Sequence, residues 1–390
     1  MRRGESATTH GNAFLLMSEI DVAVPLGPRS YRIRIVHGDV DAFRPFLADC
    51  LSNQAAAKGC RQALLVVDPA VGRRAHALTP QFESVGITPH LVEIGGGEAA
   101  KSISHATRLW QELVDRKADR HTLVVPVGGG VVGDLAGFVA ATYARGIPLL
   151  MVPTTLLAQV DSAVGGKVAV NLPHAKNIVG AFHQPIGVWI DTAFLETLPR
   201  RELACGMAEV VKYGVILDRD FFEWIEAHAD DLLARQPRAI THAIARSCEI
   251  KAKVVSSDER EETGARAVLN FGHTVAHAIE AVAGYGGAFQ HGEAVAAGMV
   301  AECRVAEKLG WIDASIRNRL FTVLHRLGLP THAPGLDRAA LLDAMRVDKK
   351  NRQGAIRFVL PRGLGQVEIT DAPDLALIRE VLDELGASPT

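Results

Sequence analysis

The stretch TLVVPVGGGVVGDLAGFVAAT, residues 122–142, decides the fold of this chain. Its first part, Thr122–Val127, is an apolar and largely β-branched run that predicts a buried strand. Gly128, Gly130 and Gly133 follow with the spacing G-x-G-x-x-G, and Leu135–Thr142 predicts a helix. A strand, a glycine turn and a helix in this order are typical of the βα unit from which parallel α/β sheets are built.

The glycine turn also indicates nucleotide binding. Glycines let the backbone approach a pyrophosphate, whose charge is met by the N-terminus of the following helix. The pattern alone is weak, because tight βα turns also use glycine for steric reasons, and no acidic residue for a ribose clearly follows about 20 positions on. A second turn, Gly95–Lys101, carries Glu98 and Lys101, which suit a sugar and a phosphate; taken alone, it is better explained as a helix N-terminus with early acidic charge.

Outward from residues 122–142, short β-branched runs alternate with amphipathic stretches such as Ile103–Arg116 up to about residue 195. This alternation predicts a mainly parallel, Rossmann-like sheet with helices on both faces. The predicted strands are Tyr31–Val36, Ala63–Val67, Leu91–Ile94, Thr122–Val127 and Leu149–Val152.

The pattern changes after Leu198-Pro199, where long helical periods begin and continue to about residue 350. Two short predicted strands, Ala355–Leu360 and Gln366–Ile369, precede a last predicted helix at Pro373–Leu385. We therefore expect a loose extension at residues 1–19, an α/β nucleotide-binding domain at 20–198 and a mainly α-helical domain at 199–390 that binds metal and substrate. Ligands of such proteins usually lie between the two domains, beyond the carboxyl ends of the strands.

Composition excludes several functional classes. The formal net charge of −2 argues against nucleic-acid binding, which needs a concentrated basic surface. The five cysteines are scattered and contain no C-x-x-C pair, as expected for a reducing cytoplasm and not for a cysteine-built zinc module. No apolar run approaches the roughly 20 residues of a membrane span. The sequence therefore predicts a cytoplasmic protein without a membrane partner.

A cluster of histidines and acids indicates a catalytic metal. His273, His277 and Glu280 lie at i, i+4 and i+7 of an expected helix, and His291 follows closely. Two histidines, one carboxylate and an open position are the pattern of a catalytic rather than a structural site. Glu209 precedes Lys212 by three residues among apolar neighbours, so it is a candidate for the carboxylate ligand beside His273 and His291; the alternatives are ordinary helix histidines and a surface ion pair.

Basic and amide side chains follow the glycine turns in unusual number. Residues 152–177 combine lysines and asparagines with glycines and hydroxyls in an otherwise apolar segment, which indicates either an anion site or a solvated lysine-bearing loop. Further basic groups surround the histidine cluster, so the sequence favours a phosphorylated and carboxylated substrate. These polar residues are Lys167, Asn171, Lys176, Asn177, Lys212, Lys251, Lys253, Arg266, Asn270, Lys349 and Lys350.

At this point the chain resembles the 3-dehydroquinate synthases, a family of sugar phosphate cyclases. The runs from Gly128 to Glu209 and from Lys251 to Met299 carry the resemblance, which extends from about residue 90 to 352. It implies NAD and Zn²⁺ (or Co²⁺) as cofactors, a homodimer, and conversion of 3-deoxy-D-arabino-heptulosonate 7-phosphate to 3-dehydroquinate and phosphate in the shikimate pathway. The implied steps are transient oxidation with NAD, phosphate elimination, re-reduction, ring opening and aldol closure.

The resemblance also implies residue roles. The metal ligands would be Glu209, His273 and His291. Substrate contacts would come from Lys167, Asn177, Lys212, Lys251, Arg266, Asn270, His277 and Lys349 or Lys350, with Arg145 reaching across the dimer interface. The NAD site would comprise Gly96, Gly97, Glu98, Lys101, Gly130, Val131, Val132, Gly133, Asp134, Thr154, Thr155, Asp161, Lys167, Lys176, Phe194, Leu195, Glu196 and Thr197.

Some positions depart from the family pattern, namely Val168, Leu172, His174 and Ala175, whereas the polar residues beside them are retained. Sister cyclases that act on other sugar phosphates tend to differ where this chain has Asn270 and His277, which favours the dehydroquinate branch. Two other hypotheses are a metal-dependent polyol dehydrogenase of the glycerol-dehydrogenase type and a non-catalytic nucleotide-binding protein.

Overall fold

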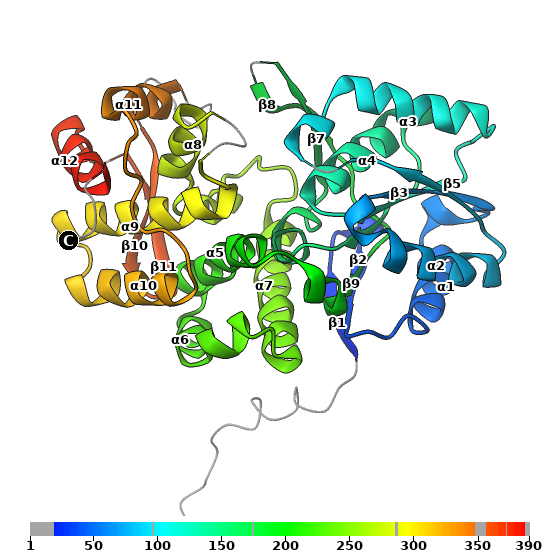
Figure 1. The fold of residues 1–390 in the computed structure, drawn as a ribbon, viewed down its shortest axis with the longest axis horizontal. Helices are drawn as coiled ribbons and strands as arrows, with labels where there is room; N and C mark the ends of the chain where they lie inside the picture. The colour runs from blue at the N-terminus through cyan, green and yellow to red at the C-terminus, as the bar shows by residue number, and fades with distance from the viewer. Residues whose placement is uncertain are drawn as a thin grey trace, which may run out of the picture.

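The structure is a computed structural model that describes residues 19–95, 97–173, 175–284, 288–347, 356–371 and 373–386. A seven-stranded sheet forms the N-terminal half, with strand order β1-β2-β9-β6-β5-β3-β4 (Figure 1). All neighbouring strands run parallel except β1, which is antiparallel to β2. The strands are β1 (Glu19–Val24), β2 (Tyr31–Val36), β3 (Gln62–Val67), β4 (Thr88–Glu93), β5 (Thr122–Gly128), β6 (Leu150–Pro153) and β9 (Gly187–Asp191).

Helices cover both faces of this sheet. Successive side chains of a strand point to opposite faces, and in the central strands both sets of side chains are apolar. In β3, Leu64 and Val66 join one hydrophobic core, whereas Leu65 and Val67 join the other. The first core includes helices α3 (Ile103–Asp115) and α4 (Gly130–Thr142), and the second includes α1 (Phe43–Asn53) and α2 (Gly72–Ser84). The predicted Rossmann-like, mainly parallel sheet is confirmed.

Four strands were not predicted from the sequence. β1 and β9 complete the sheet, and Glu19, assigned to the expected extension, is the first residue of β1. A separate antiparallel hairpin is formed by β7 (Lys167–Leu172) and β8 (Ala175–Phe182). Lys167 and Asn171 of the predicted anion site lie on β7, and Lys176 and Asn177 lie on β8.

The C-terminal half is mainly helical, as predicted (Figure 1). A small antiparallel pair, β10 (Phe358–Gly363) and β11 (Gln366–Thr370), matches the two short strands expected there. The helices are α5 (Arg200–Leu217), α6 (Arg219–Leu233), α7 (Pro237–Ser257), α8 (His273–Val282), α9 (His291–Lys308), α10 (Ala314–Arg326), α11 (Arg338–Val347) and α12 (Leu375–Gly386). No helix of the described ranges is long and apolar enough to cross a membrane.

The two halves share buried apolar residues. One continuous core runs from the sheet strands through α5 and α7 to α9 and α12. In Figure 1, α5 and α7 lie between the sheet and the group formed by α9, α10 and α12. This shared packing fixes α5, which carries Glu209, relative to the strand ends of the sheet.

Candidate metal and nucleotide site

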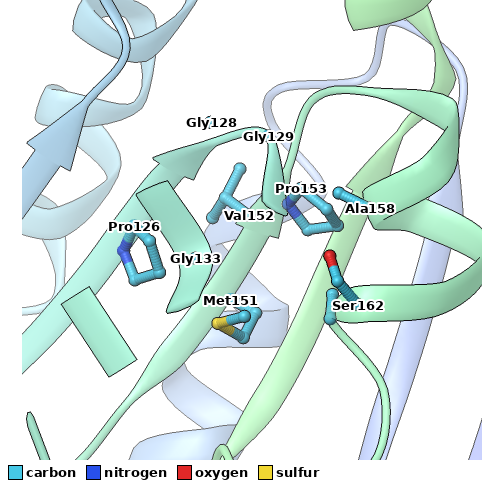
Figure 2. A pocket seen from close by; sticks show the side chains of 10 residues that line it. Pro126, Gly128, Gly129, Gly133, Met151, Val152, Pro153, Ala158 and Ser162 are labelled. Carbon is cyan, nitrogen blue, oxygen red and sulfur yellow. The ribbon is translucent and has the colours of Figure 1, made fainter. Parts of the chain in front are cut away.

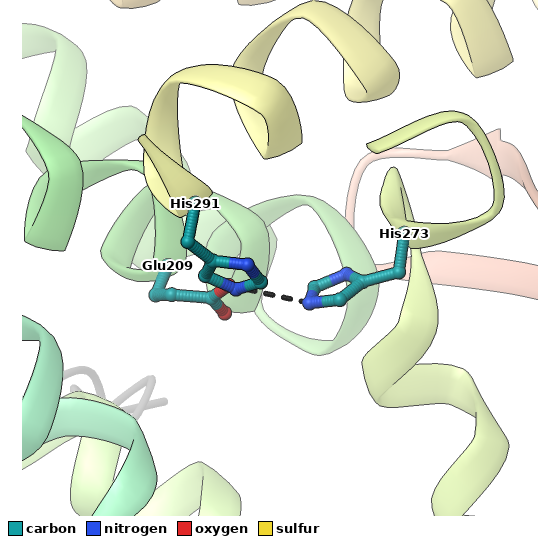
Figure 3. A group of neighbouring side chains, drawn as sticks. All are labelled: Glu209, His273 and His291. Atoms are coloured by element: carbon teal, nitrogen blue, oxygen red, sulfur yellow. Dashed lines mark ion pairs between the residues drawn. The ribbon is translucent and has the colours of Figure 1, made fainter. Parts of the chain in front are cut away.

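Glu209, His273 and His291 come together where three helices meet, as Figure 3 shows. Their ligand atoms all lie within 4.8 Å of one another. The Nε2 atoms of His273 and His291 lie 3.5 and 3.6 Å from the same oxygen, Oε1 of Glu209. The sequence alone grouped these three residues, and the structure brings them to one point.

Close helix packing places these side chains. The expected helix that carries His273 and His277 begins at His273, because the residue before it, Gly272, has a φ of 81°, a left-handed conformation outside the helix. A Cβ built on Gly298 of α9 would lie 2.1 Å from the carbonyl oxygen of Gly272. Glycine at position 298 therefore lets α9 approach the start of α8 closely enough for their first residues to face each other.

The arrangement of atoms at Glu209 fits a divalent cation. The side chain is fully buried, and Oε1 has no hydrogen-bond partner within the described ranges. An unpaired carboxylate oxygen facing two imidazole nitrogens is costly in a core unless a cation binds it. One carboxylate and two imidazoles are a ligand set that suits Zn²⁺ or Co²⁺.

The carboxylates of Glu209 and Glu280 favour a positive charge in the space between them. Burial alone would raise the pKa of Glu209, but the adjacent Lys212 ammonium holds it below its usual range. Burial would also lower the pKa of His291, yet its contacts with Glu209 and Glu280 raise that pKa to about 10. The paired carboxylates therefore stabilise a cation at this place.

A second buried cluster lies beside the triad. Lys251 of α7 is 5% exposed, and its Nζ donates to Oδ1 of Asp161 at 2.6 Å and also to the Asp161 carbonyl. The Tyr213 hydroxyl donates to the same Oδ1 at 3.1 Å. Burial would raise the pKa of Asp161, but the ammonium groups of Lys251 and Lys212 lower it well below its usual range. Asp161 is thus an ionised carboxylate held between lysines.

Arg266 and Lys167 mark the next layer of cations. The guanidinium of Arg266 is 3% exposed and donates to the carbonyl of Glu259 at 3.1 Å. Its Nε lies 3.6 Å from Glu261, which also pairs with Lys167. Lys167 is 52% exposed at the start of the hairpin, so its ammonium is open to solvent, unlike those of Lys212 and Lys251.

The segments predicted to hold NAD also meet in space. Lys101, just after β4, contacts both Asp134 of α4 and Asn177 of the hairpin. Asn171 of the hairpin donates to Glu98 at 2.7 Å. These contacts join the second glycine turn, the start of α4 and the hairpin, which are separated by many residues in the sequence.

The G-x-G-x-x-G turn lines a small pocket with Pro153 and Ser162 (Figure 2). A Cβ on Gly130 would approach the Ser162 hydroxyl to 3.0 Å, and one on Gly129 would approach Thr155 to the same distance. Internal packing therefore already requires small residues here. The same turn also begins α4 at Gly130, so its backbone N–H groups are available to an anion.

The remaining predicted cofactor residues have diverse environments. Thr154 is buried, and its N–H donates to the carbonyl of Gly128 at 3.0 Å. Phe194 and Leu195 are buried core residues, and Glu196 pairs with Arg74 at 2.6 Å. Val131 is half-buried, Val132 is a core residue, and Thr197 ends a 3₁₀ turn. Gly96, Lys349 and Lys350 lie outside the described residues.

Arg145 lies away from the metal triad, in a turn after α4. Its side chain is exposed, and its φ of 69° follows another positive φ at Ala144. A left-handed backbone conformation is unusual for residues other than glycine. It costs on the order of 1–3 kcal/mol of conformational free energy at each of these two consecutive residues. The exposed position fits a contact with a second subunit, a role that stays a prediction.

Sequence reasoning missed two residues of this region, Tyr213 and Glu261. Glu280 was placed on the histidine face of its helix but was given no role, and its spacing from His273 was the available signal. Tyr213 and Glu261 had no such signal, because their partners Asp161 and Lys167 lie far away along the chain. His277 does lie near the triad, its ring centroid 5.6 Å from that of His273, and Asn270 is half-buried just before α8.

Several solved structures share this fold. One is 2-epi-5-epi-valiolone synthase ValA from Streptomyces hygroscopicus subsp. jinggangensis 5008, with NAD⁺ and Zn²⁺ bound (26% identity, TM-score 0.79, 91% of this chain and 96% of that chain). Another is 2-deoxy-scyllo-inosose synthase with carbaglucose-6-phosphate, NAD⁺ and Co²⁺ (26% identity, TM-score 0.79, 94% and 99%). A probable glycerol dehydrogenase from Sinorhizobium meliloti 1021 shares only the fold, at 17% identity and a TM-score of 0.57 over 91% of this chain and 96% of that one.

The fold and the site thus define a protein of the sugar phosphate cyclase class. It combines an α/β half with a helical half, which carries the three side chains that could bind a metal ion. Residues 91–205 match the N-terminal part, and residues 206–351 the C-terminal part, of 3-dehydroquinate synthase. A 3-dehydroquinate synthase from Desulforamulus reducens (strain ATCC BAA-1160 / DSM 100696 / MI-1) is 47% identical over 350 residues, which are 89% of this chain and 95% of the relative. The chain belongs to the 3-dehydroquinate synthase family.

Proposed function

We propose that the chain is a phosphate-eliminating carbon–oxygen lyase that converts 3-deoxy-D-arabino-heptulosonate 7-phosphate to 3-dehydroquinate and inorganic phosphate, in the shikimate pathway. One observation carries the proposal most strongly: the triad Glu209, His273 and His291 lies beside buried cations in a member of this family. A dehydrogenase of a neutral polyol has no need for Lys212, Lys251 and Arg266 around its metal. Similarity to relatives named as 3-dehydroquinate synthases supports this substrate over those of sister cyclases.

The proposal assigns the metal and NAD to separate parts of the site. Glu209, His273 and His291 would hold Zn²⁺ or Co²⁺, which when bound acts as a Lewis acid toward a substrate alcohol. The glycine turns at 96–101 and 130–134, with Thr154, Thr155 and Lys176, would hold NAD, the reversible hydride carrier. Asp161 lies between these two groups of residues and would face the nicotinamide.

The cations of the chain bind and orient the substrate. Lys212 and Arg266 are rigidly held by packing, so their charges are preorganised for a carboxylate and hydroxyls rather than rearranged on binding. Lys251 is fixed by Asp161 and would donate to a substrate hydroxyl next to the metal. The more exposed Lys167, with Asn177, Asn270, His277 and Lys349 or Lys350, would hold the phosphate.

This arrangement provides clamps rather than a strong general base at the leaving phosphate. Phosphate leaves when the carbon next to an oxidised alcohol loses a proton and the C–O bond to the phosphate breaks. The substrate phosphate can itself accept that proton, so the lysine and asparagine groups need only hold it in place. His277 remains the imidazole near the triad that is not a proposed ligand, and it would assist proton transfer.

The test is phosphate release from 3-deoxy-D-arabino-heptulosonate 7-phosphate with catalytic NAD and zinc. A coupled dehydroquinase reports the second product by ultraviolet absorbance, and sedoheptulose 7-phosphate is the control substrate. We expect phosphate and coupled absorbance to rise together without accumulation of NADH. Release from sedoheptulose 7-phosphate alone would move the chain to a sister cyclase. NADH accumulating on a simple polyol would instead support a dehydrogenase.

The proposal includes a homodimer in which Arg145 completes the partner subunit's site, and a division of the chain near Leu198-Pro199. The dimer rests on the resemblance alone, whereas the division is also supported by the start of α5 at Arg200. Sedimentation of the purified protein tests the dimer.

A further inference from the structure

Glu280 contacts both parts of the site, although the proposed function gives it no role. It lies on α8, two turns after His273, and its side chain is 13% exposed. Its Oε2 lies 3.1 Å from Nδ1 of His291, and its Oε1 lies 3.5 Å from Nζ of Lys176 on the hairpin. The two oxygens of one carboxylate thus contact different partners.

The contact with His291 determines which ring nitrogen is free for a metal. A neutral imidazole carries its proton on one nitrogen and can bind a cation only through the other. When a cation replaces the proton on Nε2, an acceptor at Nδ1 keeps the remaining proton there, so that the lone pair of Nε2, which lies beside Oε1 of Glu209, is free for the metal. His273 has the same arrangement, because its Nδ1 lies 3.0 Å from the carbonyl oxygen of Phe271 and its Nε2 also faces Glu209.

The two histidines differ in how this acceptor is supplied. For His273 the acceptor is a backbone carbonyl two residues away, which no substitution at that position removes. For His291, the first residue of α9, the acceptor is a side chain from another helix, α8. The orientation of His291 therefore depends on Glu280.

We propose that Glu280 is a positioning residue for the metal site: it fixes the tautomer and ring orientation of His291, and so sets metal affinity. The inference rests on the metal part of the proposed function, but it does not depend on which sugar phosphate is the substrate. Partners in this outer position typically change metal affinity by about 10–100-fold when they are removed. Glu280 would act on the metal only through His291.

The experiment measures zinc affinity directly, without NAD or substrate, by competition with a chromophoric chelator. Glu280→Ala should weaken zinc binding by about 10–100-fold. Glu280→Gln keeps an oxygen that can accept from Nδ1, so it should recover most of the affinity lost in the alanine variant. Lys176→Met, which removes the partner of the other oxygen, is the matched control and should change zinc affinity by less than about threefold.

A second arm separates orientation from general damage to the fold. In a His291→Ala background, Glu280→Ala should cause no further loss of zinc affinity, because its effect passes through that imidazole. Visible absorption bands of bound Co²⁺ should change in Glu280→Ala and be retained in Lys176→Met. Additive losses in the double variant, or unchanged zinc affinity in Glu280→Ala, would overturn the inference while leaving the proposed function intact. A wild-type protein that binds neither metal would overturn both.

Discussion

Replacing Asp161 with asparagine removes one charge from a buried cluster while keeping its shape. The Lys251 ammonium, 5% exposed, donates to Asp161 at 2.6 Å, and an asparagine oxygen can still accept this bond. What is lost is the charge that balances a buried cation. Breaking a buried pair costs about 3–5 kcal/mol, and we expect the lower end, about 3 kcal/mol, because the Asp161 side chain is 29% exposed.

This free energy should appear as a lower melting temperature. At roughly 2 °C per kcal/mol for a large domain, Asp161→Asn should melt about 6 °C below the wild type by calorimetry in chelator-treated, NAD-free buffer. The matched variant is Asp161→Asn combined with Lys251→Met, which removes both charges. Because the pair is coupled, the double variant should be more stable than the sum of the single effects predicts, by about 1–3 kcal/mol.

The pH dependence gives a second check with a definite sign. The pKa of Asp161 is lowered in the folded state, so its stabilising effect is present above its unfolded pKa of about 4 and is lost as the pH falls through the folded value. Burial lowers the pKa of Lys251 despite the carboxylate, and more so without it. The variant should therefore regain stability as the pH rises toward 10, since its unfolded chain binds more protons. Strict additivity of the two substitutions, or a melting temperature within 2 °C of wild type, would refute this reasoning.

Three further predictions address the metal ligands, the helix packing and the dimer. His273→Ala should lose zinc by elemental analysis, and stoichiometric zinc in that variant would exclude the ligand role. Gly298→Ala should destabilise the protein by about 1–3 kcal/mol, because its Cβ would lie 2.1 Å from the carbonyl oxygen of Gly272. Gly363→Ala, whose Cβ meets no atom within 4 Å, is the control; equal melting temperatures for the two variants would contradict the packing argument. Arg145→Ala should reduce activity sharply and leave NAD affinity unchanged. Mixing it with His273→Ala should restore about a quarter of wild-type activity if the arginine crosses a two-fold interface, and no recovery would argue against a shared site.

Local sequence patterns predicted most of the secondary structure. The apolar runs that became β2, β3, β5 and β6 were recognised because strand and helix periods are encoded within a few residues. β9 was missed, although all five of its residues are buried, because its position between β2 and β6 depends on pairing with strands far away in the sequence. The hairpin β7–β8 was missed for a different reason: polar lysines and asparagines interrupt its apolar strand pattern.

The sequence by itself determined the residue types and spacing of the metal site, since the side chains of His273, His291 and Glu209 supply the nitrogen and oxygen ligands that a divalent cation requires. Only the tertiary structure decided how each of them is held. The acceptor for His291 is Glu280 on another helix, and the ammonium that balances Asp161 comes from α7, 90 residues away along the chain. Such partners leave no local period, because burial and charge balance depend on three-dimensional neighbours rather than on sequence spacing.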